Sequence, residues 1–329
     1  MVQLAEISGE VVFTTGMCGY YESLTDPSFS GQILVFTYPL IGNYGVPKME
    51  HWESEKIHVS GVVVSSCCEG WSHHRGLRSL LEWLSEAGIP ILTDVDTRAL
   101  TKKLRSAGTL LGVISTRRDA KSFIDTNKQH LVERVSKKQK QVYGKGKKRV
   151  ILVDCGVKQS QLNELQKFPI ELVRVPFDYD YTGEPFDGVF YSNGPGDPQT
   201  CVTTIAILQK AMKIGKPIYG VCLGNQLMAL AAGGTTYRLP FGHRGQNQPC
   251  MQLESGKCFI TSQNHGFAVD EASLPQGWRV TFRNLNDQSV EGIEHELFPF
   301  VAVQFHPEAK PGPMDTNWFF ERFYQCLQS

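Results

Sequence analysis

The chain has 329 residues, 41% of them hydrophobic and 20% charged, and its 33 basic and 33 acidic side chains cancel at pH 7. This composition is typical of a globular protein long enough for two domains, and the neutral balance argues against nucleic acid as the main partner. No apolar run approaches the roughly 18 residues of a membrane span, and the start MVQLAEISGE lacks the charged and apolar regions of a signal peptide. The nine cysteines show no CxxC spacing. We therefore expect reduced thiols, a cytoplasmic protein, no metal and no membrane partner.

The first part of the chain contains short β-prone segments separated by turn-rich stretches. Strands are predicted at residues 10–14, 32–37 and 61–65, and one amphipathic helix at residues 78–87. The pattern indicates an α+β region, and we find no catalytic pair in it.

Residues 133–149, ERVSKKQKQVYGKGKKR, differ in composition from the sequence on either side. They are basic, polar and contain glycine. A nucleic-acid patch would have this composition, but a solvated linker between domains is a more common explanation. We therefore predict a first domain over residues 1–140 and a second over residues 148–329.

Beyond this linker, strands alternate with helices. Strands are predicted at 150–154, 170–175, 187–192, 216–221 and 300–305, and helices at 159–166, 200–214 and 225–232. Such alternation predicts an α/β fold with a doubly wound, largely parallel sheet. Functional residues in such sheets gather at the carboxyl ends of the strands.

Cys222 lies at one of these strand ends, in the sequence YGVCLGNQ. Glycines at 220 and 224 flank it with the spacing of a nucleophile elbow, a tight turn that glycine permits. A free cysteine is more often a buried structural residue, but a helix N-terminus favours the thiolate. A general base is needed to decide between these two roles.

His306 and Glu308 follow the last predicted strand, in the sequence QFHPE. A lone histidine would be interpreted as a core residue, but here a carboxylate stands two residues on, and Pro307 stiffens the turn between them. A thiol nucleophile requires a histidine that takes its proton and an acid that fixes the histidine tautomer. Together with Cys222, these residues predict a Cys–His–Glu site.

The sequences GVCLGNQ and QFHPE, in this order on an α/β domain, resemble those of the class I (triad) glutamine amidotransferases. The resemblance implies that Cys222 attacks the side-chain amide of glutamine, that His306 is the general acid and base, and that Glu308 orients His306. It also implies substrate contacts from YSNGPGDP and SQNHGFAV, which as bare sequence would be turns, with His265 structural. The implied substrate site consists of Gly194, of Gly196 and Leu223 as oxyanion donors, and of Gln226, Asn264, Gly266 and Phe267 around the amino-acid end of glutamine.

The stretch GEVVFTTGMCGYYESLTDPSFSGQILVFTYPLIGNYGVP resembles the N-terminal domain of carbamoyl-phosphate synthetase small subunits, and DTRALTKKLRSAG and FGHRGQNQP resemble further stretches of that family. The resemblance implies that Ser28 reaches across the domains to bound L-glutamine. It implies an ATP-dependent synthetase subunit or fused domain as partner, which receives ammonia and which, rather than this chain, uses ATP, bicarbonate and Mg or K ions. The alternatives are a free-standing hydrolase of γ-glutamyl compounds and a catalytically idle regulatory subunit; the first domain argues against the hydrolase and the intact Cys–His–Glu set against the idle subunit.

Two features depart from the family pattern. Asn225 stands where members usually have histidine, and because it is outside the triad we expect tuning of activity rather than loss. The chain begins close to SGEVVF, without the usual first strand and turn, and ends just after the amidotransferase region. The resemblance leaves open whether the product feeds pyrimidine or arginine synthesis, and whether the chain is a separate subunit or part of a multifunctional one.

Overall fold

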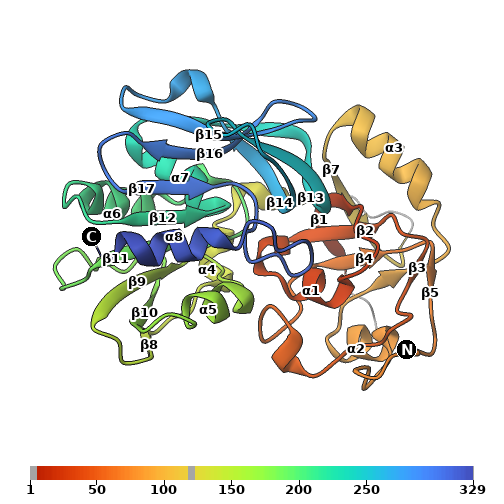
Figure 1. The fold of residues 1–329 in the computed structure, drawn as a ribbon. Helices are drawn as coiled ribbons and strands as arrows, with labels where there is room; N and C mark the ends of the chain where they lie inside the picture. The colour runs from red at the N-terminus through yellow and green to blue at the C-terminus, as the bar shows by residue number, and fades with distance from the viewer. Residues whose placement is uncertain (1–5, 118–122, 329) are drawn as a thin grey trace.

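The computed structural model describes residues 6–117 and 123–328, which form two main sheets side by side (Figure 1). The smaller sheet belongs to residues 6–117, which we call the N-terminal region, and the larger sheet belongs to the rest. Residues 1–5, at the start of the first predicted domain, and residue 329, at the end of the second, lie outside the described residues. Within the described residues, no helix is both long and apolar enough to cross a membrane.

The smaller sheet has the strand order β6–β4–β2–β1–β7 and is parallel except for β7, which pairs antiparallel with β1. The strands and the helix predicted from the sequence are confirmed as β1, β2, β4 and α2. Helices α1 and α3 were not predicted. The elements of this region are β1 (Ile7–Thr14), α1 (Tyr20–Thr25), β2 (Gln32–Phe36), β3 (Leu40–Ile41), β4 (Gly61–Val63), β5 (Ser66–Cys67), α2 (Leu80–Glu86), β6 (Ile91–Leu92), α3 (Thr97–Ala107) and β7 (Leu110–Ile114).

The larger sheet has ten strands in the order β14–β13–β15–β16–β17–β12–β11–β9–β10–β8. The strands from β17 to β10 are parallel, as predicted, and antiparallel strands extend the sheet at both edges. Its elements are α4 (Leu131–Val135), β8 (Gln141–Tyr143), β9 (Lys148–Asp154), α5 (Gln159–Leu165), β10 (Ile170–Pro176), β11 (Gly188–Tyr191), α6 (Val202–Met212), β12 (Ile218–Val221), α7 (Leu223–Ala232), β13 (Thr236–Gln252), β14 (Cys258–Val269), β15 (Trp278–Asn284), β16 (Val290–His295), β17 (Phe300–Val303) and α8 (Trp318–Cys326).

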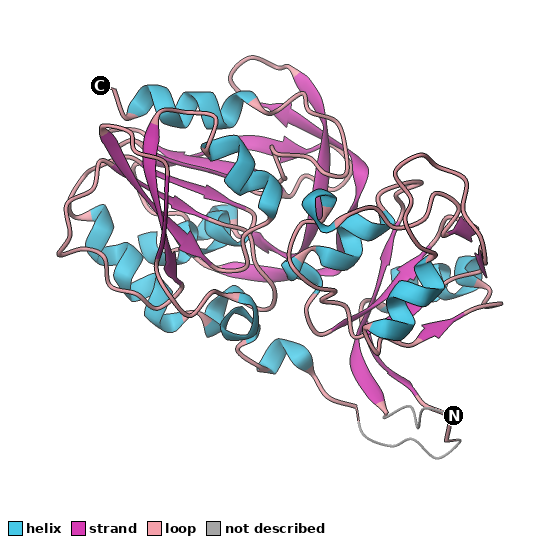
Figure 2. Cartoon of the chain, turned by 90° about the horizontal axis from the view of Figure 1, so that it is seen from below, coloured by secondary structure: helices cyan, strands magenta, loops and turns pink. Residues whose placement is uncertain are grey.

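The parallel strands of the larger sheet are buried on both faces, which explains their continuous apolar sequences. Side chains alternate along a strand, so Ile151 and Val189 pack on one face with helices α6 and α7. Leu152 and Phe190 pack on the other face with α5 and α8. Figure 2 shows helices on both sides of this sheet, the doubly wound arrangement that the sequence predicts.

The prediction of a solvated linker at residues 133–149 is wrong in part. Helix α4 covers its first residues and packs Val132 into the core, and β8 adds an antiparallel edge strand to β10. An edge strand of three residues with little buried surface gives no periodic hydropathy signal, so the composition of the segment suggested a linker. The interval between the two predicted domains, residues 141–147, therefore contains a strand of the larger sheet.

The prediction of a polar turn at SQNHGFAV is also wrong, because these residues belong to β14. This strand pairs with β13 in a long antiparallel hairpin, and β13 also contacts the N-terminal region. The amide of Thr15 donates to the carbonyl of Arg244 at 3.3 Å, and the amide of Thr109 donates to that of Pro240 at 2.8 Å. Strand β13 therefore joins the two parts of the molecule.

Glycines allow α7 to pack directly on the parallel strands. A Cβ atom on Gly224 would lie 2.5 Å from the carbonyl oxygen of Tyr191 on β11, and one on Gly220 would lie 2.7 Å from the backbone of Gly224. Both distances are below any real van der Waals contact. The close approach of helix and sheet therefore requires glycine at both positions.

We expect Gly224→Ala to lower the free energy of unfolding by about 1–3 kcal/mol, the usual cost of forcing extra atoms into a packed core. Gly183→Ala is the matched control, because a Cβ atom there would meet nothing within 4 Å, and it should leave stability unchanged within about 0.5 kcal/mol. Urea denaturation of the two variants measures the difference. Equal stability of the two variants would contradict this account of the packing.

Candidate active site

Cys222 occupies the sharp turn between β12 and α7, at the carboxyl end of a central parallel strand. Its backbone has φ 56° and ψ −103°, a conformation that costs a non-glycine residue about 1–3 kcal/mol and marks functional sites. The amide of Cys222 donates to the carbonyl of Val303 at 2.9 Å, which fixes the turn to β17. The structure thus has the elbow geometry that the glycine spacing predicts.

The Cys222 thiol is buried at the N-terminus of the ten-residue helix α7. Its Sγ donates to the carbonyl oxygen of Asn264 on β14 across 3.6 Å. The first amide groups of a helix carry partial positive charge, which favours the thiolate. The sulfur is therefore held between a helix terminus and the neighbouring strand, in a setting that suits a nucleophile.

His306 and Glu308 lie just beyond β17 and are both buried. His306 Nδ1 and Glu308 Oε1 are 2.6 Å apart, and the His306 amide donates to the carbonyl of Ser262 at 2.8 Å. The other ring nitrogen, Nε2, has no conventional hydrogen-bond partner among the described residues, while the His306 ring interacts electrostatically with the Cys222 thiol. The structure brings together the three residues that the sequence places in one site.

Burial opposes a charge on His306 and on Glu308, but each charge stabilises the other. Burial alone would lower the pKa of His306, whereas the Glu308 carboxylate and the Cys222 thiol raise it to about 10. Burial alone would raise the pKa of Glu308, whereas His306 and Lys158 hold it at about 2. Both shifts favour the charged form of the pair, in which an imidazolium lies beside a carboxylate.

Lys158, at the start of α5, supports Glu308 from the other side. Its Nζ lies 3.2 Å from Glu308 Oε1 and donates to two backbone carbonyls just after Glu308, at 2.9 and 2.8 Å. Burial would lower the pKa of Lys158, but the carboxylates of Glu308 and Glu53 raise it above its usual value. Glu53, from the N-terminal region, lies 3.9 Å from Lys158 Nζ and accepts hydrogen bonds from Ser160. Neither Lys158 nor Glu53 belongs to a recognisable motif, so neither is predicted from the sequence.

A cavity lies beside Cys222, between the larger sheet and the N-terminal region. Leu223, directly after Cys222, begins α7. The other residues that the resemblance assigns to glutamine all line the cavity: Ser28, Gly194, Gly196, Gln226, Asn264, Gly266 and Phe267. Five further residues line it that the sequence did not assign to the substrate: Glu10, Gln32, Asn127, Arg244 and His265.

Hydrogen bonds across the cavity connect Ser28 and its neighbour Asp26 to the larger sheet. Asn193 Nδ2 donates to Ser28 Oγ at 2.8 Å, and Asn264 Nδ2 donates to Asp26 Oδ2 at 3.0 Å. The amide of Ser28 donates to Asp26 Oδ1 at 2.9 Å. The N-terminal region is therefore part of the cavity wall, and the implied contact of Ser28 with glutamine stays a prediction.

Backbone geometry and a side-chain hydrogen bond hold Gly194, Gly196 and Gln226 in place. A Cβ atom on Gly194 would lie 2.2 Å from the carbonyl oxygen of Cys155, and Gly196 has φ +87°, which glycine adopts without strain. Gln226 Nε2 donates to the carbonyl of Phe267 at 2.9 Å, which links α7 to β14. These contacts fix the backbone that faces the cavity.

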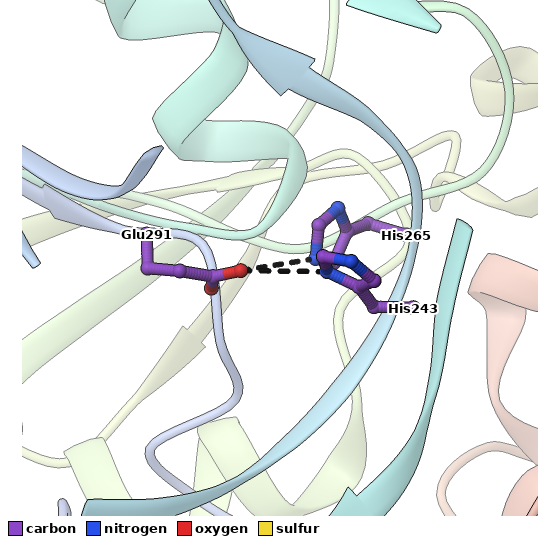
Figure 3. A group of neighbouring side chains, drawn as sticks. All are labelled: His243, His265 and Glu291. Atoms are coloured by element: carbon purple, nitrogen blue, oxygen red, sulfur yellow. Dashed lines mark ion pairs between the residues drawn. The ribbon is translucent and has the colours of Figure 1, made fainter. Parts of the chain in front are cut away.

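Three buried side chains, one each from β13, β14 and β16, converge next to the cavity: His243, His265 and Glu291 (Figure 3). His243 lies between two carboxylates, with Nε2 2.8 Å from Asp287 and Nδ1 3.5 Å from Glu291, and these raise its pKa to about 9 although burial lowers it. Burial and the His243 charge lower the pKa of His265, whose Nδ1 lies 2.8 Å from the carbonyl of Phe267. Their potential ligand atoms lie within 4.8 Å of one another, but these contacts already account for their positions. His265 therefore lies in the structural environment that the sequence predicts for it.

Asn225, the departure from the family pattern, is fully buried in α7 and contacts the segment that leads to His306. Its Nδ2 donates to Gln304 Oε1 at 3.2 Å. The Asn225 side chain thus contacts Gln304, two residues before His306. This placement is consistent with the expected tuning of activity, which stays a prediction.

Comparison with known proteins identifies both parts of the chain. The family model of glutamine amidotransferase class-I matches residues 151–326, and that of the carbamoyl-phosphate synthase small chain, CPSase domain, matches residues 2–114. A Thermoplasma acidophilum protein assigned as a component of GMP synthase has a related fold, with a TM-score of 0.50 and 21% identity over 55% of this chain and 94% of that one.

Two curated relatives are similar over 98% of this chain. The arginine-specific small chain of carbamoyl phosphate synthase from Neosartorya fischeri is 45% identical, and the match covers 75% of its length. The multifunctional protein CAD of Squalus acanthias is 49% identical, and the chain spans 15% of its length. Fold and site define a class I glutamine amidotransferase. Within that class, the chain belongs to the carbamoyl-phosphate synthase small-chain family.

We expect Glu308→Gln to destabilise the protein most at mildly acidic pH. The pKa of His306 is raised from 6.5 to about 10, so its pairing contributes stability that is complete below about pH 6.5 and is lost as pH rises through about 10. The pKa of Glu308 is lowered from 4.5 to about 2, so its own contribution is present above about pH 4.5 and is lost only as pH falls through about 2.

Urea denaturation of wild type and Glu308→Gln tests this expectation from about pH 5 to about pH 10. The difference in unfolding free energy should be largest near pH 5–6.5 and should shrink toward pH 10, following the pKa of His306. Glu321→Gln, on the exposed face of α8, is the control and should show no such trend. A difference that stays constant over the whole range would rule out the charged pair.

Proposed function

We propose that this chain is the glutaminase of a glutamine-dependent carbamoyl-phosphate synthase. It hydrolyses L-glutamine to glutamate and ammonia, and it delivers the ammonia to a synthetase subunit or domain that makes carbamoyl phosphate from bicarbonate and ATP. The observation that carries the proposal is the strained Cys222 elbow beside the buried His306–Glu308 pair, on a chain whose first part matches the synthase small-chain model.

In this proposal Cys222 Sγ attacks the side-chain amide carbon of glutamine, while His306 holds the proton of the thiol. The amide N–H groups of Leu223 and Gly196 stabilise the oxyanion of the tetrahedral intermediate. When the C–N bond breaks, His306 protonates the leaving nitrogen and ammonia departs. Water then attacks the γ-glutamyl thioester with His306 as base, which releases glutamate and restores the thiol. Glu308 keeps the imidazole oriented and stabilises its positive charge.

The amino-acid end of glutamine is held by the other cavity residues. In the proposal, Gly194 shapes the glycine-rich turn beside the nucleophile, and the remaining contacts come from Ser28, Gln226, Asn264, Gly266 and Phe267. All of these residues line the same cavity as Cys222, which supports the assignment.

The proposed partner is an ATP-dependent synthetase, either as a separate subunit or as a fused domain. The names of the relatives, a multifunctional protein and a synthase small chain, support it. The chain itself would need no cofactor, and ATP, bicarbonate, Mg²⁺ and K⁺ would be used by the partner. A cytoplasmic location is part of the proposal and is supported by the nine cysteines, all of which are described and none of which lies in a disulfide.

We expect Cys222→Ser to abolish glutamine hydrolysis, because a serine hydroxyl is a far weaker nucleophile than a thiolate in this site. Carbamoyl phosphate synthesis from free ammonia by the partnered synthetase should continue, since that route does not use the thiol. Cys258→Ser, at an exposed cysteine, is the control and should keep both activities. Ammonia release from glutamine at near wild-type rate in Cys222→Ser would show that the nucleophile is assigned wrongly.

We also expect the isolated chain to be a weak glutaminase whose turnover rises when the synthetase binds. A hydrolytic site that is fully active without its ammonia acceptor would waste glutamine, and a coupling free energy of about 1–3 kcal/mol changes activity roughly 5–150-fold. The test is steady-state glutaminase kinetics with and without saturating synthetase and its substrates. Unchanged constants, with complex formation verified independently, would favour a free-standing hydrolase.

A further inference from the structure

We infer that Gln32, Asn127 and Arg244 form a recognition site for the zwitterionic amino-acid end of the substrate. The inference rests on the proposed function, because it takes glutamine as the substrate. All three residues line the cavity that contains Cys222, and each has a buried polar atom without a hydrogen-bond partner among the described residues: Gln32 Oε1, Asn127 Nδ2 and Arg244 Nε. Buried polar atoms are nearly always hydrogen-bonded, so three unpartnered atoms around one cavity point to a polar ligand.

The orientation of Gln32 is determined by Glu10. Glu10 Oε2 lies 2.8 Å from Gln32 Nε2, and Glu10 Oε1 is paired with Arg238. An ionised carboxylate only accepts hydrogen bonds, so Gln32 must turn its NH₂ group toward Glu10 and its carbonyl oxygen away from it. This leaves an oriented acceptor, Gln32 Oε1, next to a buried negative charge. Such an environment suits the α-ammonium group of an amino acid.

Arg244 and Asn127 supply hydrogen-bond donors, whereas Gln32 supplies an acceptor. Arg244 is 5% exposed, and its Nη1 donates to the carbonyl of Phe241 at 2.9 Å. Its Nη2 lies 3.3 Å from the position that a Cβ atom would take on Gly266, so the guanidinium lies against the backbone already proposed to hold the substrate. Asn127 belongs to the 3-10 turn Thr126–Lys128, beside β1. A guanidinium and an amide NH₂ suit the α-carboxylate.

The two sets of groups explain how one cavity selects glutamine over simpler amides. The Gln32 acceptor requires a cation, and the Asn127 and Arg244 donors require an anion. If an amide lacks the α-ammonium group or the α-carboxylate, the protein groups that would bind the missing charge stay desolvated and without a hydrogen-bond partner, which costs binding energy. Gln32 lies on β2 and Asn127 in the turn beside β1, so the side of the cavity formed by the smaller sheet and this turn would determine substrate specificity.

The test compares Gln32→Met and Asn127→Leu in the full-length protein with its synthetase. The matched controls are Gln325→Met on α8 and Asn163→Leu on the exposed face of α5. Both cavity variants should raise KM for L-glutamine roughly tenfold or more, with a much smaller change in kcat, and the controls should not. Asn127→Asp, which keeps the size of the side chain but repels a carboxylate, should raise KM further.

Two analogues, used as competitive inhibitors, identify the group that each residue recognises. Glutaramate lacks the α-amino group, so Gln32→Met should leave its inhibition constant unchanged. 4-Aminobutanamide lacks the carboxylate, so Asn127→Leu should leave its inhibition constant unchanged. The alkylation rate of Cys222 by iodoacetamide, which has no amino-acid end, should be the same in all variants and shows that the site is intact.

The outcomes separate this inference from the proposed function. A wild-type protein that does not hydrolyse glutamine would overturn the proposed function. A wild-type protein that hydrolyses it, with cavity variants that keep the wild-type KM and the wild-type discrimination between analogues, would overturn the inference alone. Cavity variants that lose iodoacetamide reactivity together with glutamine turnover would show a purely structural role and would also overturn it.

Discussion

The buried charge of Glu308 is the constraint on which the site depends. Removing a carboxylate from water costs several kcal/mol, and close, well-oriented cations together with hydrogen bonds compensate that cost. His306 and Lys158 both approach the same oxygen, Oε1, at 2.6 and 3.2 Å. The His306 ring meets Glu308 through Nδ1, which fixes the orientation of the ring. The other ring nitrogen, Nε2, then has no conventional hydrogen bond within the described part of the chain. The position of the proton acceptor is thus a consequence of how one buried carboxylate is neutralised.

This constraint extends into the N-terminal region. Lys158 lies near Glu53 as well as Glu308, and Glu53 also accepts hydrogen bonds from Ser160 and contacts the start of α5 through its backbone. With the hydrogen bonds from Asn193 to Ser28 and from Asn264 to Asp26, these contacts make the N-terminal region a part of the active-site wall. Its sequence holds no catalytic pair, but its position is coupled to the charges beside the nucleophile.

The sequence predicts the features of this site that are local along the chain. The elbow follows from a strand, a flanked cysteine and a helix within about fifteen residues, and His306 and Glu308 are two residues apart; both features follow directly from spacing. Lys158 and Glu53 are more than a hundred positions apart, and no pattern near either residue indicates the other. Gln32 and Arg244 escaped prediction for the same reason.

Strand β14 and edge strand β8 show why parts of the fold could not be predicted. The middle residues of β14, 262–266, are polar or glycine yet largely buried, and several of them line the cavity beside Cys222, so their hydropathy resembles that of a loop. Strand β8 has only three residues, and two of them are exposed, so it gives no periodic pattern of buried and exposed side chains. Hydrophobic periodicity detects strands that have one face toward water and one face toward an apolar core. Neither β8 nor the middle of β14 has this arrangement.

The same contacts bear on how a bound partner would control the glutaminase in the proposed function. A single hydrogen bond to a charged group contributes about 1.5–3 kcal/mol, which is similar to the coupling energies typical of allosteric control. The bonds from Asn264 to Asp26 and from Ser160 to Glu53 cross from the larger sheet to the N-terminal region, and Asn264 also supplies the carbonyl that contacts Cys222 Sγ. A partner that shifts the N-terminal region enough to alter one of these bonds changes the surroundings of the thiol or of Lys158 directly. Control of the reaction therefore requires no long-range rearrangement of the larger sheet, because the coupled groups are already in contact.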